Sequence, residues 1–104
     1  MNKASDLMKP FRDRINALDD QIVDLLVERY KIIREVGAFK EENNIPTVVE
    51  SRVKEVINRV GDRAGEDFED IVCEVYALMI AIAHDVEDEV RGHGDKFRDD
   101  EDDE

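Results

Sequence analysis

Two basic residues, Arg29 and Lys40, interrupt an apolar stripe that follows the first part of the chain. In an α-helix each residue is rotated by about 100° around the axis relative to the one before it. The rotation from Arg29 to Lys40 therefore exceeds three full turns by only about 20°. Both cations would therefore share a helix face with Phe11, Ile15, Leu18, Ile22, Leu25, Ile33 and Val36. Because burying an unpaired cation is costly, the spacing predicts either acidic partners from another helix or an anionic ligand held between helices.

Three further ionisable residues accompany these two cations. Arg12 lies at the edge of the same stripe, Arg52 falls in the first turn of a second predicted helix, and Glu87 lies beside the apolar face of a third. Guanidinium and ammonium groups gathered in this way would bind the carboxylates of a small anion. The alternative is a buried ion-pair network of Arg29, Lys40 and Glu87 that only fixes how the helices pack. Periodicity alone leaves both interpretations open.

Other reactive side chains have no spacing that indicates chemistry. His84 and His93 lack metal-ligand spacing to each other or to Cys73, so neither a metal nor a cofactor is expected. Cys73 is the single cysteine and is expected to pack between helices. The sequence contains no recognisable nucleophile arrangement and no glycine-rich phosphate loop.

The composition favours one small all-α domain. The chain has 104 residues, of which 41% are charged and 6% aromatic. Six acidic residues at positions 99–104 contribute to the formal charge of -13, so the rest carries -7. An acidic surface without a basic cluster argues against nucleic-acid and membrane partners. The sequence has one cysteine, no apolar signal-peptide region at its start and no apolar run long enough to span a bilayer, so the protein is expected to be cytoplasmic.

The apolar stripe predicts a first helix of unusual length, from Ser5 as its N-cap to Asn43 or Asn44. Such a helix would be roughly 55 Å long, whereas a compact domain of this size has a radius of gyration of only about 13 Å. The helix therefore cannot bury its apolar face within one chain. Because the stripe repeats about every 3.5 residues, we expect a homodimer whose first helices run together.

A turn and a second helix are predicted next. Pro46 and the asparagines before it favour a turn. Thr47 and Glu50 fit a capping box, so the second helix is expected to begin at Thr47 and to end near Gly61. Its apolar stripe consists of Val49, Val53, Val56, Ile57 and Val60.

The third predicted helix runs from Phe68 to about Val90. Its apolar positions are Ile71, Val72, Val75, Tyr76, Met79, Ile80, Ile82, Ala83 and Val86. The glycines at positions 92 and 94 end this helix, and residues 93–104 form an acidic tail that is expected to be disordered. We therefore expect a helical domain over residues 1–92.

The first predicted helix resembles that of the AroQ class of chorismate mutases. The family pattern there is LR-x-x-I-(D/N)-x-L-D-x-x-I-x-x-L-L-x-x-R, followed by I/V-G-x-x-K. Residues 11–29 of this chain read FRDRINALDDQIVDLLVER, and the match continues through Val36, Gly37 and Lys40. The resemblance covers most of residues 7–90, strongly in the first helix and weakly afterwards. It implies three helices in an intertwined homodimer, in agreement with the argument from helix length.

The resemblance also implies an activity. Chorismate mutases rearrange the dianion chorismate to prephenate in the shikimate pathway to aromatic amino acids, a unimolecular step without metal, cofactor or covalent intermediate. By position, Arg29 and Lys40 would bind the substrate carboxylates, and Lys40 would also reach the ether oxygen. Arg12 would enter the partner subunit's site, and Arg52 would flank the pocket. Catalysis would come from holding the reactive conformer and stabilising charge on the ether oxygen.

Several positions depart from the family pattern. Val49 and Val53 stand where well-known bacterial members have acids that hold the ring hydroxyl, and Ala83 replaces a serine. Glu87 replaces the usual glutamine beside the ether oxygen, so a working Glu87 is expected to be protonated.

Two alternative functions follow from these departures. Isochorismate-pyruvate lyases of salicylate and siderophore biosynthesis share the fold and have similar apolar residues at the second-helix positions, so they are the alternative enzyme class. A non-catalytic helical interaction dimer is the alternative outside the enzymes, although it gives little reason to retain four cations together.

Overall fold

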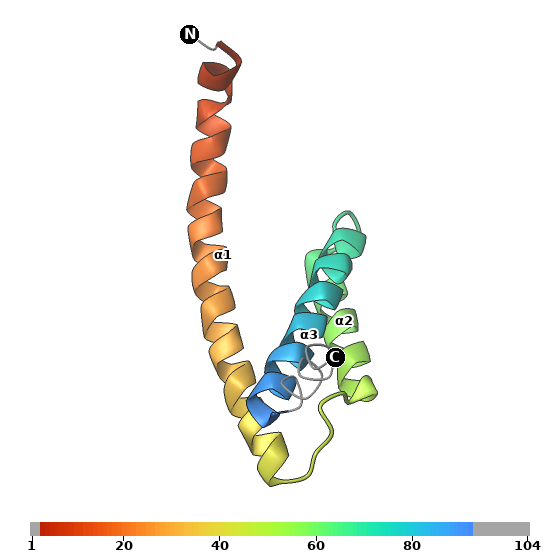
Figure 1. Ribbon diagram of the computed structural model, residues 1–104. Coiled ribbons are helices and arrows are strands. Elements are labelled where there is room, and N and C mark those ends of the chain that lie inside the picture. Colours follow the sequence, from red (N-terminus) through yellow and green to blue (C-terminus); the bar gives the residue numbers. More distant parts are fainter. Residues whose placement is uncertain (1–2, 93–104) are drawn as a thin grey trace, which may run out of the picture. The chain divides into compact units, whose positions relative to one another are not determined.

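The computed structural model describes residues 3–92 as three α-helices. Helix α1 spans Lys3–Glu42, α2 spans Glu50–Ala64 and α3 spans Glu69–Arg91 (Figure 1). No strand occurs among these residues, so the predicted all-α fold is confirmed. Over the same residues, no helix combines the length and the apolar character needed to cross a membrane. The acidic tail and His93 lie outside the described residues, and the domain boundary at residue 92 stays a prediction.

The chain divides into two units, Met1–Lys31 and Ile32–Glu104, with the boundary inside α1. In the first unit the predicted apolar stripe is exposed. The exposed fractions of Phe11, Ile15, Leu18, Ile22 and Leu25 range from 52% to 63%. The predicted long helix is thus confirmed, and one chain leaves this part of its stripe uncovered. The homodimer that would cover it stays a prediction.

The second unit has a small core between α2 and α3, which lie side by side (Figure 1). This core consists of buried Val56, Val60 and Ile80 together with partly buried Val53, Ile57, Val72 and Tyr76. Gly61 allows the two helices to approach closely, because a Cβ there would lie only 2.9 Å from Cys73 Sγ. The Cys73 thiol donates to the carbonyl oxygen of Ile57 at 3.6 Å. Cys73 therefore packs between helices, as predicted.

Three predicted helix ends are wrong. Helix α1 begins at Lys3, so Ser5 lies inside it and is not the N-cap. Helix α2 begins at Glu50 after Val49, which is its N-cap, so the expected capping box of Thr47 and Glu50 does not form. The Thr47 hydroxyl instead donates to Asp88 on α3. Helix α2 also continues past Gly61, because that glycine packs against α3, and it ends at Ala64.

The ends of α1 and α3 confirm the predicted stop signals. Asn44 adopts the left-handed conformation with φ of 57°, and the N–H of Ile45 donates to the carbonyl of Lys40 at 2.9 Å. This is the Schellman arrangement, in which a left-handed residue lets the chain satisfy the last helical carbonyls. Helix α3 ends at Arg91, and Gly92 directly after it is left-handed, with φ of 89°. The left-handed residues Asn44 and Gly92 therefore determine where α1 and α3 end.

Candidate functional site

A buried ion pair joins the C-terminal turn of α1 to α3 within the second unit. Lys40 Nζ lies 2.8 Å from Glu87 Oε1 and donates to the carbonyl oxygen of Thr47 at 2.7 Å. The side chains of Lys40 and Glu87 are 16% and 5% exposed. An ammonium group has three N–H donors, and these contacts occupy two of them. The structure therefore confirms the Lys40–Glu87 part of the ion-pair interpretation while leaving one donor available for another acceptor.

Gly37 makes this ion pair possible because it lets α1 and α3 approach closely. A Cβ at residue 37 would lie 3.1 Å from Glu87 Cα and 3.2 Å from the Glu87 carbonyl oxygen. These are backbone atoms, so they cannot move aside as a flexible side chain can. The glycine of the family pattern, Gly37, is thus explained by steric fit. It allows α1 and α3 to come close enough for Lys40 to contact Glu87.

A second polar network surrounds Thr47. The Thr47 hydroxyl donates to Asp88 Oδ1 at 2.7 Å and accepts a hydrogen bond from Arg91 Nη1 at 3.0 Å. Arg91 Nε donates to Glu41 Oε1 at 2.9 Å, and the Arg91 side chain is only 7% exposed. This network was not predicted from the sequence. Its one local signal is the spacing of Asp88 and Arg91, which places them on neighbouring turns of the same helix face.

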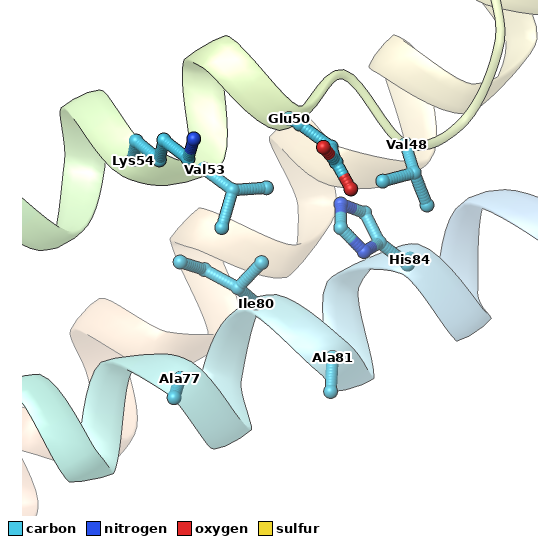
Figure 2. A pocket seen from close by; sticks show the side chains of 8 residues that line it. All are labelled: Val48, Glu50, Val53, Lys54, Ala77, Ile80, Ala81 and His84. Atoms are coloured by element: carbon cyan, nitrogen blue, oxygen red, sulfur yellow. The ribbon is translucent and has the colours of Figure 1, made fainter.

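A cavity of about 350 Å³ opens between the N-terminal half of α2 and the middle of α3 (Figure 2). Its lining residues are Val48, Glu50, Val53, Lys54, Ala77, Ile80, Ala81 and His84. Figure 2 shows Glu50 and His84 pointing toward one another from the two helices. The cavity includes Val53, a predicted site residue, and it gives partly buried His84 a location that its sequence spacing did not indicate.

Three other predicted site residues lie on α2 and α3. Arg52 is in the first turn of α2, as predicted, and its Nη1 lies 2.8 Å from Glu55 Oε1 on the exposed surface. Val49 is the N-cap of α2 and is partly buried. Ala83 is 4% exposed and lies one turn before Glu87 on α3.

Arg12 and Arg29 belong to the part of α1 that lies in the first unit. Arg12 is exposed, and Arg29 is partly buried. Among the five predicted ionisable site residues, the structure thus brings Lys40 and Glu87 into direct contact. The predicted roles of Arg12, Arg29 and Arg52 toward a ligand stay predictions.

Comparison with known proteins identifies the family. The family model described as chorismate mutase type II matches residues 11–88, so the chain belongs to the chorismate mutase type II family. The chain is also 32% identical over 53 residues to the bifunctional chorismate mutase/prephenate dehydratase of Aquifex aeolicus (strain VF5). That match covers 51% of this chain and 15% of the bifunctional protein. No solved structure matches the chain significantly. The resemblance inferred from the first helix is confirmed.

Proposed function

We propose that this chain is a chorismate mutase that converts chorismate to prephenate in aromatic amino acid biosynthesis. The observation that carries the proposal is the buried Lys40–Glu87 pair, which lies where the family pattern ends its first helix with a lysine. The substrate is a small dianion, and its rearrangement is unimolecular. Binding, orientation and charge stabilisation by the chain's own residues are therefore sufficient, with no cofactor. A cytoplasmic location fits this pathway.

Lys40 has the geometry of a group that stabilises developing charge. Its ammonium is held by the Glu87 carboxylate and the Thr47 carbonyl, so it is oriented before the substrate arrives. Its third N–H donates to the ether oxygen of the substrate as the carbon–oxygen bond breaks. Donors that are fixed in a water-poor site avoid reorganisation at the moment of reaction, and removing one costs about 100- to 1000-fold in rate.

Glu87 stands where the family has a glutamine beside the ether oxygen. In the structure its carboxyl group faces Lys40 of α1, with Asp88 next to it on α3. In the proposed site, Glu87 takes the position of that glutamine and holds the Lys40 ammonium that donates to the ether oxygen.

The exposed stripe of the first unit supports a homodimer with shared sites. Phe11, Ile15 and Leu18 are among the half-exposed side chains that a second copy would cover. Covering five such side chains contributes on the order of 5 kcal/mol per chain, at roughly 1 kcal/mol for each half-buried side chain. In such a dimer, Arg12 enters the partner's site, Arg29 and Lys40 bind the carboxylates of the substrate, and Arg52 flanks the pocket.

The test is to supply purified protein with chorismate and to follow its loss together with prephenate formation. Arg29→Ala and Lys40→Gln are expected to lower kcat/KM by at least about 100-fold. Arg34→Ala and Lys31→Ala are matched controls, because both residues are exposed on α1 and neither belongs to the proposed site. Circular dichroism checks the fold of each variant, since Lys40→Gln also removes the cation that faces buried Glu87. Full activity in both site variants would refute the site, and an inactive wild-type protein would refute the function.

The apolar character of the α2 positions supports isochorismate-pyruvate lyase as a second candidate. Val49 and Val53 offer no acid for a ring hydroxyl, and Val53 lines a mostly apolar cavity. A parallel assay with isochorismate discriminates the two enzymes, because the lyase releases pyruvate and the mutase does not. Turnover of neither substrate supports the non-catalytic helical dimer.

A further inference from the structure

Thr47 is the point at which three polar contacts meet in the second unit. Its carbonyl oxygen accepts a hydrogen bond from Lys40 Nζ at 2.7 Å. Its hydroxyl donates to Asp88 Oδ1 at 2.7 Å and accepts from Arg91 Nη1 at 3.0 Å. A hydroxyl group can donate one hydrogen bond and accept another, so both contacts restrain this side chain. The hydroxyl network therefore restrains the same residue whose carbonyl orients the Lys40 ammonium.

The anchors of this network are themselves restrained. Arg91 is nearly buried and also donates to Glu41 on α1, so its guanidinium bridges α1 and Thr47. Asp88 follows Glu87 directly on α3. At the other end of the connecting segment, the N–H of Ile45 donates to the carbonyl of Lys40. The short segment between α1 and α2 is thus held at Ile45 and again at Thr47.

The Thr47 hydroxyl does not cap helix α2, although the local sequence predicts that it would. A threonine three residues before a glutamate at a helix start normally caps the helix. Here α2 begins after Val49, which makes no side-chain capping hydrogen bond. Helix α2 therefore lacks this cap. The hydroxyl instead connects Thr47, whose carbonyl oxygen accepts from Lys40, to Asp88 on α3.

We propose that Thr47 is a positioning residue for Lys40, held in place by Asp88 and Arg91. This inference rests on the proposed function, in which Lys40 acts on the ether oxygen. Thr47 does not touch the substrate. It directs the ammonium by fixing the position of one of its two acceptors, and an error of about 1 Å in such a group can cost up to 100-fold in rate.

The primary experiment compares Thr47→Val with Thr47→Ser. Valine keeps the backbone carbonyl and the branched shape but removes the hydroxyl. We expect Thr47→Val to lower kcat about tenfold with KM changed by less than about twofold, because positioning acts in the transition state. Thr47→Ser is expected to restore kcat. Ser51→Ala is the matched control, since Ser51 is an exposed hydroxyl residue in the first turn of α2, and it should leave kcat unchanged.

A second measurement separates positioning from a purely structural role. In a Lys40→Gln background, Thr47→Val should cause no further fall in kcat, because the residue through which it acts is already absent. The proposal would be overturned if Thr47→Val lowered kcat by the same factor in the Lys40→Gln background as in the wild-type protein. A Thr47→Val protein with wild-type kcat would also overturn it.

A third readout does not depend on turnover. The ¹⁵N spectrum of the Lys40 ammonium group reports how fast its protons exchange with water, and exchange should be several-fold faster in Thr47→Val than in Thr47→Ser. Equal exchange in the two variants would overturn the positioning role. Faster exchange in a protein that fails to convert chorismate would support the positioning of Lys40 while refuting the proposed function.

Discussion

The two units of this chain each contain a lysine–carboxylate pair with the same separation. In the first unit, Lys9 Nζ lies 2.8 Å from Asp13 Oδ2, and the two side chains are 72% and 59% exposed. In the second unit, Lys40 Nζ lies 2.8 Å from Glu87 Oε1, and the exposed fractions are 16% and 5%. Water and salt screen the first pair, so it contributes little. Each partner of the second pair depends on the other, because an isolated buried charge is costly.

The two units also differ in their buried apolar residues. Among the described residues, the second unit has buried apolar side chains such as Val56 and Ile80, whereas the first unit has none. Exposed apolar side chains occur in both units, for example Leu18 at 57% and Leu78 at 62%. The second unit therefore forms a small core of its own, while the first has only an exposed apolar face for a partner to cover.

The largest expected effect comes from changing the exposed face of the first unit. Leu18→Glu places a charge in the stripe, so we expect a monomer with kcat/KM lowered by at least about 100-fold, since burial of an unpaired charge is strongly unfavourable. Light scattering after size exclusion gives the oligomeric state. Asn16→Glu is the matched control, because helical periodicity places residue 16 away from the stripe. A Leu18→Glu dimer with normal activity would show that this face needs no partner.

An intermediate effect is expected from Gly37→Ala in the second unit. The new Cβ meets the backbone of Glu87, so we expect a loss of about 1–3 kcal/mol in the free energy of unfolding, together with reduced kcat from a displaced Lys40. Urea unfolding measures the loss. In an unobstructed helix the same change would stabilise the protein by about 1 kcal/mol. A gain in stability would therefore mean that the close approach of α1 and α3 is absent.

The smallest effect is expected from changing the buried pair itself. Glu87→Gln keeps the size of the side chain, and the amide oxygen can still accept a hydrogen bond from Lys40, so we expect kcat within a few-fold of the wild-type value. Asp13→Asn is the control, because it removes the carboxylate of the exposed pair in the first unit, and its kcat should equal that of the wild-type protein. A fall of about 100-fold or more in Glu87→Gln would show that the site needs the carboxylate itself.

Features that depend on neighbouring residues were predictable from sequence. The apolar spacing predicted α1, Asn43 and Asn44 predicted its end, and Gly92 predicted the end of α3. The pattern of residues 11–40 also indicated the family that the match over residues 11–88 confirms. Each of these signals lies within one helix or at its end, where dihedral preferences and periodicity decide the outcome.

Tertiary structure decided the rest. The pattern at Thr47 and Glu50 predicted a cap, but Asp88 and Arg91, distant in sequence, compete for the same hydroxyl. Likewise, periodicity placed Lys40 and Glu87 beside apolar faces without showing that they form a pair 47 residues apart. Periodicity specifies the direction of a side chain around its own helix. The distance between helices depends on what their contact surfaces allow, and here the bare backbone at Gly37 allows the approach that joins Lys40 to Glu87.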